Sequence, residues 1–145
     1  MNFSATAWLP WALLSAVFAA MTAILAKIGI ANVDSDLATL LRTFVVAIAL
    51  GALVVFTGKW QNPAHLSGRS LLFLTLSGLA TGASWFCYFR ALKIGEASRV
   101  APVDKLSVVL VALFAVAFLG ERPSPREWTG IALVGAGALL LSLKR

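Results

Sequence analysis

The sequence predicts an all-α integral membrane protein, a bundle of five transmembrane helices. The chain has 145 residues, of which 60% are hydrophobic and only 12% are charged, and its mean hydropathy is +0.91. Soluble domains carry about a quarter charged residues, so this chain has too few to cover a water-exposed surface. Its long apolar runs lack the period-two alternation of a membrane β-barrel, and this favours helices.

Five apolar segments are long enough to be considered as spans, because a hydrocarbon core about 30 Å thick takes roughly 20 helical residues to cross. They cover about 8–30, 37–57, 70–92, 98–119 and 128–143. The fifth is short, but the flanking Arg126 and Lys144 can extend to the interface. Short connections force successive helices to run antiparallel as neighbours. We therefore expect residues 1–145 to form a single domain.

The ends of the first two segments carry the expected signals. Trp8 and Trp11 open the first at the depth where aromatic side chains meet the membrane interface. The second follows three candidates for a helix N-cap, Asp34, Ser35 and Asp36. Both segments therefore have defined boundaries.

The last three segments are bounded by charged or turn-forming residues. Arg90 and Lys93 close the third, and the fourth opens with a proline, Pro102, followed by the adjacent Asp104 and Lys105. The fifth follows the polar turn GERPSPRE. A charged pair at the mouth of a spanning helix is unfavourable unless the bundle supplies partners or water.

Charged residues near the helix ends form the most informative pattern. Because neighbouring helices alternate in direction, six of them fall toward one membrane face: Lys27, Arg42, Arg90, Lys93, Asp104 and Lys105. The sequence thus predicts a layer of five cations and one carboxylate at one mouth of the bundle. The alternative is that the cations only extend to lipid head groups. Asp104 has its own alternative, a structural role in the first helical turn, where the helix dipole favours a carboxylate.

Aromatic residues cluster one turn before Arg90, in the stretch GASWFCYFRA. Aromatic rings beside a cationic mouth suit an amphipathic or aromatic solute in a partly apolar cavity, although lipid-facing or core positions would also explain them. The candidate substrate-binding residues are Lys27, Arg42, Trp85, Tyr88, Arg90, Asp104 and Lys105.

Residues for catalysis are not apparent. The single histidine, His65, lies in a connection, and the single cysteine, Cys87, lies inside an apolar run, so the usual metal cluster is missing. No phosphate-cradling GxxxxGK occurs. The net charge of +6 comes from basic residues at the ends of apolar runs, which fits interface anchoring better than nucleic-acid binding. We expect no enzyme, no cofactor, no metal and no nucleic-acid partner.

The stretch from Ala91 onward, ending in LGERPSPREWTGIALVGAG, resembles the second part of an EamA domain of the drug/metabolite transporter superfamily. The resemblance comprises a helix-opening Ala101–Pro102, a helix-closing Gly120–Glu121 and a glycine-rich last helix. Upstream, Lys27 and Arg42 match basic positions that recur in the family. We favour a structural turn for Glu121, beside Arg122. The resemblance covers about 8–143.

This resemblance implies a secondary transporter with alternating access and no ATP hydrolysis, in the cytoplasmic (inner) membrane of a bacterium. Longer family members carry two such domains as an inverted repeat, whereas this chain carries one. The resemblance therefore implies an antiparallel homodimer, or pairing with a different half-size partner.

The mechanism that follows is a hypothesis. Two halves meet around a cavity lined by the third and fourth helices, where Trp85 and Tyr88 contact the solute. Lys27, Arg42 and Arg90 supply positive potential, and Asp104 balances it and carries a coupling proton.

Two other functions remain open. One is a proton-coupled drug exporter of the small multidrug resistance type, which needs a carboxylate in the first helix, where this sequence offers Lys27 and no acid. The other is a non-transporting membrane subunit of a larger complex.

The positive charges outside the spans are balanced between the two faces. One face has Lys59, Arg69, Arg122 and Arg126, and the other has Lys93, Arg99, Lys144 and Arg145. Since orientation follows an excess of Lys and Arg on the cytoplasmic side, this balance suggests that identical chains insert in both orientations. If Lys27, Arg42, Arg90 and Lys105 are counted too, the face of the C-terminus carries the excess and would be cytoplasmic.

Overall fold

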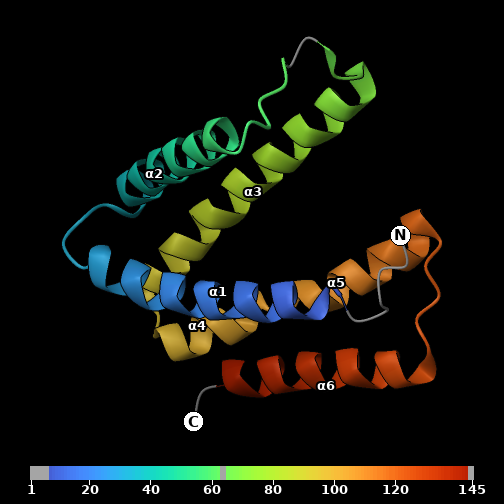
Figure 1. Cartoon of the computed structure of the whole chain (residues 1–145). Helices are drawn as coiled ribbons and strands as arrows, with labels where there is room; N and C mark the ends of the chain where they lie inside the picture. Colours follow the sequence, from blue (N-terminus) through green and yellow to red (C-terminus); the bar gives the residue numbers. More distant parts are fainter. Residues whose placement is uncertain (1–6, 63–64, 144–145) are drawn as a thin grey trace. The chain divides into compact units, whose positions relative to one another are not determined.

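The computed structural model describes residues 7–62 and 65–143 and is helical, as predicted (Figure 1). Lys144 and Arg145, which entered the charge comparison, lie outside the described residues. The elements are α1 Leu9–Gly29, α2 Ser35–Phe56, α3 Gly68–Ile94, α4 Ala97–Asp104, α5 Ser107–Phe114, a π-helical segment η2 Ala115–Leu119, and α6 Pro125–Ser142.

Four helical stretches in the described part of the chain are long and apolar enough to cross a membrane: α1, α2, α3 and the stretch Ala97–Leu119. This confirms the predicted fold class, an all-α membrane protein. The span expected at about 128–143 corresponds to α6, whose passage through the membrane stays a prediction.

The start of α2 shows how the sequence sets a helix boundary. Asp34 is the N-cap, and its carboxylate accepts hydrogen bonds from the backbone N–H groups of Asp36 at 2.9 Å and Leu37 at 3.2 Å. These two donors hold the pKa of Asp34 below its usual value, because they stabilise the charged form. One of the three candidate caps is therefore the cap.

The segment expected as one helix at 98–119 is interrupted. Between α4 and α5, the amides of Lys105 and Leu106 donate at 3.0 Å to the carbonyls of Pro102 and Val103, three residues back. Such bonds are the tighter 3₁₀ pattern rather than the α-helical one. Pro102, which has no N–H to donate, lies inside α4 just before this change. Asp104 and Lys105 therefore lie at a break in the helix.

The turn between η2 and α6 has a defined structure. Gly120 has a φ of +69°, a left-handed conformation that glycine adopts without strain, and the Glu121 amide donates to the Ala115 carbonyl at 3.2 Å. Ser124 and Glu127 then form a capping box at the start of α6.

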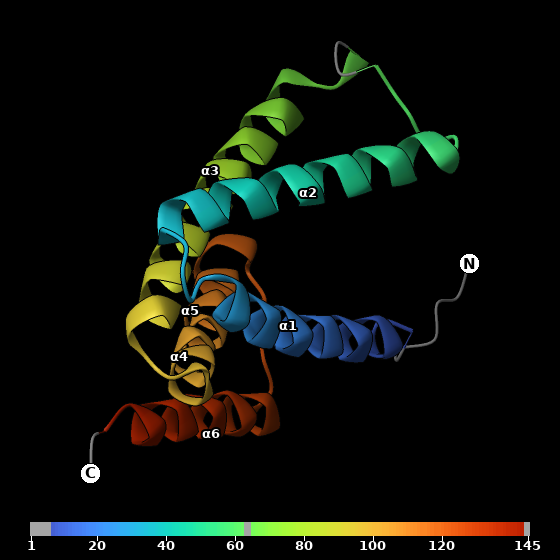
Figure 2. The ribbon, with the colours of Figure 1, turned by 90° about the vertical axis from the view of Figure 1, so that its left-hand side faces the viewer.

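The chain divides into two compact units. One contains the described residues of Met1–Ile24 and Ile94–Arg145, and the other contains Leu25–Lys93. In the first, which we call the α4–α6 unit, α6 packs against α4 and α5. The second, which we call the α1–α3 unit, holds only the end of α1, from Leu25 to Gly29, together with α2 and α3. In it, α2 and α3 cross near the start of α2 and separate toward their connection (Figure 2).

Few side chains are buried within the single chain. Phe89 and Leu92 are 2% and 0% exposed, whereas large apolar side chains such as Phe56 and Phe118 are 89% and 80% exposed. Apolar surface on this scale needs lipid or another protein to cover it. The chain is built for a membrane rather than for water.

Candidate solute-binding site

The α1–α3 unit places an arginine against aromatic rings. The guanidinium carbon of Arg42, on α2, lies 4.3 Å from the ring centroid of Trp85 and 5.4 Å from that of Phe89. Trp85 and Phe89 are four residues apart on α3 and so share one face of that helix. A cation over an aromatic face is attracted by the ring quadrupole. The rings therefore hold Arg42 in place.

Arg90 joins the same helices one turn further along α3. Its guanidinium lies 3.2 Å from the carboxylate of Asp36, in the first turn of α2, and its carbon lies 4.5 Å from the Phe86 ring centroid. The Arg90 and Asp36 side chains are 60% and 44% exposed, so the ion pair contributes only about 0–1 kcal/mol. It links the start of α2 to the end of α3 but adds little to their stability.

The end of α1 completes the cluster. Lys27 donates from Nζ to the Leu92 carbonyl at 2.5 Å, and Lys93 donates to the Val33 carbonyl. A cation is favoured at the C-terminal end of α3, where the helix dipole is negative. We call Lys27, Arg42, Arg90 and Lys93 the cation cluster.

The predicted site residues fall into two groups. Tyr88 is half-buried, and its ring centroid lies 6.3 Å from that of Phe89, so Lys27, Arg42, Trp85, Tyr88 and Arg90 all belong to the α1–α3 unit. Asp104 and Lys105 belong to the α4–α6 unit. There they form an ion pair with each other at 3.2 Å.

The list of candidate residues left out two members of this arrangement, although Phe89 belongs to the predicted aromatic cluster. Asp36 was considered only as a helix cap, yet it pairs with Arg90, and Phe89 covers Arg42 together with Trp85. The antiparallel order of the second and third segments could have pointed to both. It sets the start of one segment opposite the end of the other.

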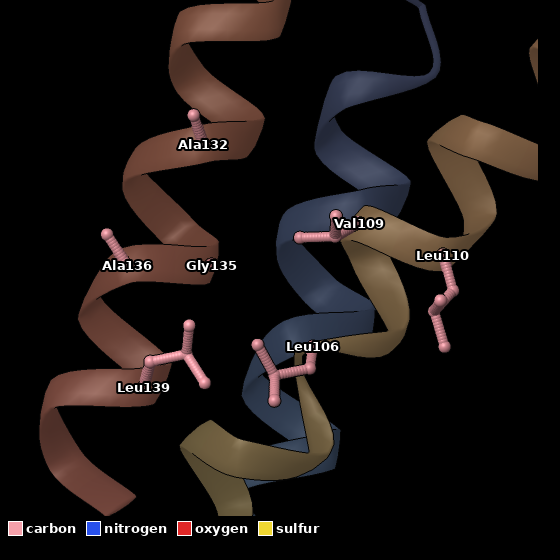
Figure 3. Close-up of a pocket in the computed structure, with 7 residues that line it drawn as sticks. All are labelled: Leu106, Val109, Leu110, Ala132, Gly135, Ala136 and Leu139. Carbon is pink, nitrogen blue, oxygen red and sulfur yellow. The ribbon is translucent and has the colours of Figure 1, made fainter. Parts of the chain in front are cut away.

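A groove of about 550 Å³ lies between α5 and α6 (Figure 3). It is lined by apolar side chains and small residues, among them Leu106, Val109, Leu110, Gly135, Ala136 and Leu139. None of the predicted site residues lines it. Its surface suits lipid tails or an apolar helix rather than a charged solute.

Comparison with known proteins decides the family. The sequence model of the EamA-like transporter family matches residues 6–143. The chain belongs to this family. The predicted resemblance is thereby confirmed, and the protein is a multi-pass membrane transporter.

Two relatives of this EamA-like chain differ in how much of it they match. An uncharacterized transporter in the cobO 3′ region of Sinorhizobium sp is 59% identical over 136 residues, which are 94% of this chain and 96% of that protein. The probable 4-amino-4-deoxy-L-arabinose-phosphoundecaprenol flippase subunit ArnE of Yersinia pestis (strain Pestoides F) is 31% identical over 84 residues, 57% of this chain and 74% of that protein. No solved structure matches.

The residues that suggested the EamA family have structural roles here. Pro102 lies beside the helix break, and Gly120 provides the left-handed residue that ends η2. The backbone of Glu121 closes that same helix end. The motif therefore shapes the helices, while the cation cluster and its aromatic neighbours offer the chemistry for binding a solute.

Proposed function

We propose that this EamA-like chain is one half of a secondary transporter that moves a small metabolite or an amphipathic solute across the cytoplasmic membrane of a bacterium by alternating access. The cation cluster carries the proposal. Four cations and several aromatic faces meet where α1 ends, α2 begins and α3 ends. Charged side chains in spanning helices are costly in lipid, and they typically mark a solute or ion pathway.

An exposed pair of glycines on α3 supports the pairing of two chains. Gly78 and Gly82 on α3 are exposed, and a Cβ added at either would meet no atom within 4 Å. Small residues on a helix face let another helix approach closely in a membrane. Two inverted copies of this chain, or this chain and a different half-size chain, would reproduce an inverted repeat.

Within such a pair we assign roles to the predicted residues. Lys27, Arg42 and Arg90 attract the solute, and Trp85 and Tyr88 contact its apolar part. Asp104, beside Lys105 at the helix break, carries a coupling proton. The protein performs no catalysis and needs no cofactor or metal.

A second candidate is a membrane subunit that acts only within a larger complex. The word "subunit" in the name of the ArnE relative favours it. An exporter of the small multidrug resistance type is less favoured, because α1 contains no acidic residue.

The decisive experiment is reconstitution of the purified chain alone in phosphatidylcholine vesicles. A panel of anionic, zwitterionic and cationic solutes is tested for uptake and efflux under an imposed pH gradient, against protein-free vesicles. We expect at least one solute to move faster than in the control. If no solute moves, but transport begins once a second half-size chain is added, the homodimer is overturned and the subunit role stands.

Orientation is tested separately with a C-terminal reporter whose activity depends on the side of the membrane. We expect active reporter on both sides, because the positive charges are balanced. Activity on one side alone would exclude an antiparallel pair of identical chains.

A further inference from the structure

Arg42 differs from the other members of the cation cluster in its partners. Lys27 donates to the Leu92 carbonyl, Lys93 to the Val33 carbonyl, and Arg90 to the Asp36 carboxylate. Arg42 contacts the rings of Trp85 and Phe89, and Tyr88 interacts with it electrostatically. Within residues 7–62 and 65–143, no hydrogen bond or ion pair reaches its guanidinium. Among the described residues, the fold supplies an acceptor for three cations of this cluster and none for the fourth.

The aromatic contacts do not satisfy the hydrogen-bonding capacity of Arg42. A guanidinium has five N–H donors that lie in its plane, and the rings of Trp85 and Phe89 offer no oxygen or nitrogen acceptor for them. Arg42 is half-buried, seven residues after Ser35, or about 10 Å along α2 at 1.5 Å per residue. At that depth an unpaired cation is unfavourable. Its N–H donors are therefore open to an acceptor from outside the described residues.

Stacking also prepares Arg42 for one kind of ligand. An arginine held on an aromatic face is fixed in orientation, and its planar fork matches the two oxygens of a carboxylate or phosphate. The charge around Arg42 also favours an anion. Asp36 pairs with Arg90, and Arg90 and Lys93 act on Asp34. Two carboxylates against the four cations of the cluster leave a net positive charge among the described residues.

We propose that Arg42, held by Trp85 and Phe89, binds the oxyanion head group of an amphipathic solute. This inference rests on the proposed transport function and narrows its substrate class. The oxyanion is recognised in the plane of the guanidinium, and the apolar part of the solute lies in the hydrocarbon layer. Beyond Thr43, α2 is apolar as far as Phe56, so a tail-bearing anion fits the position better than a free one, which loses more hydration on entering.

The test uses the full-length chain in phosphatidylcholine nanodiscs, with dodecyl phosphate as the tail-bearing probe and inorganic phosphate as the free probe. Binding of each is titrated for wild type and for Arg42→Gln. We expect dodecyl phosphate to bind about tenfold or more weakly to the variant, because a charge-assisted hydrogen bond is lost. Arg42→Lys, which keeps the charge without the planar fork, should fall between the two.

The chain offers a matched control. Arg69 also lies over a ring, with its guanidinium carbon 5.9 Å from the Phe73 centroid, near the opposite end of α3. Arg69→Gln should leave binding unchanged. Trp85→Phe, which keeps a ring over Arg42, should bind within about threefold of wild type, whereas Trp85→Leu should bind more weakly.

The two probes separate the sources of the head group. Tight binding of dodecyl phosphate that inorganic phosphate does not displace indicates a tail-bearing solute, and equal binding of both indicates a free anion at the same site. If Arg42→Gln and Arg69→Gln bind both probes alike, the inference is overturned. If binding depends on Arg42 while no solute crosses vesicles, the site stands and the transport proposal falls. If transport is unchanged in Arg42→Gln and no binding depends on Arg42, the transport proposal stands and the site falls.

Discussion

The two units of this chain hold their helices together by different means. In the α1–α3 unit, long cationic side chains bridge the helices through rings, a carboxylate and carbonyl oxygens. In the α4–α6 unit, α6 approaches α5 so closely that a Cβ at Gly135 would lie 3.0 Å from Val109 Cγ2. Exposed ion pairs contribute little and can exchange partners, whereas close packing resists change. The first unit is therefore suited to binding a solute, and the second to serving as a scaffold.

The largest expected effect concerns Asp104, a charged residue in the α4–α6 unit that we otherwise describe as a scaffold. Asp104→Asn should reduce proton-driven transport about tenfold or more and remove its pH dependence, because an amide cannot carry the coupling proton. The measurement is the initial rate in vesicles across a range of pH values. Glu96→Gln is the control, since Glu96 pairs with Arg99 at 3.2 Å in the same unit. An unchanged rate and pH profile for Asp104→Asn would remove the proton-carrier role.

Packing in the scaffold is tested by enlarging Gly135. Gly135→Val should lower the free energy of unfolding by about 1–3 kcal/mol, because its side chain would collide with Val109 and push α5 from α6. Thermal unfolding in detergent provides the measurement. At Gly137 an added Cβ would meet no atom within 4 Å, so Gly137→Val should be milder. Equal effects of the two variants would show that the close approach is not what holds α5 and α6 together.

The cation cluster should respond to a change of charge more in binding than in stability. Asp36→Asn removes the partner of Arg90 and should strengthen dodecyl phosphate binding a few-fold. It should change the free energy of unfolding by less than about 1 kcal/mol. The same titration and a melting curve measure both effects. Asp34→Asn removes an equal charge but leaves the Arg90 pair intact. Identical affinities for the two variants would mean that the pair does not limit the site.

The smallest expected effect is on the pH dependence of stability. Since its two amide partners depress the pKa of Asp34 in the folded chain, they add stability that is present above the pKa of the unfolded chain. This stability is lost as the pH falls through the lower, folded pKa. Between about pH 5 and pH 3, the melting temperature should therefore fall more steeply with decreasing pH for wild type than for Asp34→Asn. The amide of the variant caps the helix without titrating. Parallel curves would contradict this account.

Much of the fold could be predicted from local signals. Apolar runs located the helices, Asp34 stood among the expected caps, and Gly120 was expected to close a helix. Each of these depends on residues a few positions apart. The break after Asp104 was missed, although Pro102 was visible, because one proline near the start of a helix can be tolerated or can disrupt it.

The residues of the candidate site could be predicted, but the partner of each charged side chain could not. Five of the chosen residues gather in the α1–α3 unit, yet the sequence did not tell which of the cations finds an acceptor in the part of the chain that the structure describes. Arg90 and Arg42 look alike in the sequence. Their difference comes from Asp36, which lies 54 residues before Arg90.

The sequence by itself determined that this is a helical membrane protein of the EamA-like family, because hydropathy, caps and a local motif are properties of short segments. Only the tertiary structure decided which side chains meet. Pairing Arg90 with Asp36, and stacking Arg42 on Trp85, depends on how α2 crosses α3. That crossing is set by contacts between distant residues, and no run of neighbouring residues encodes it.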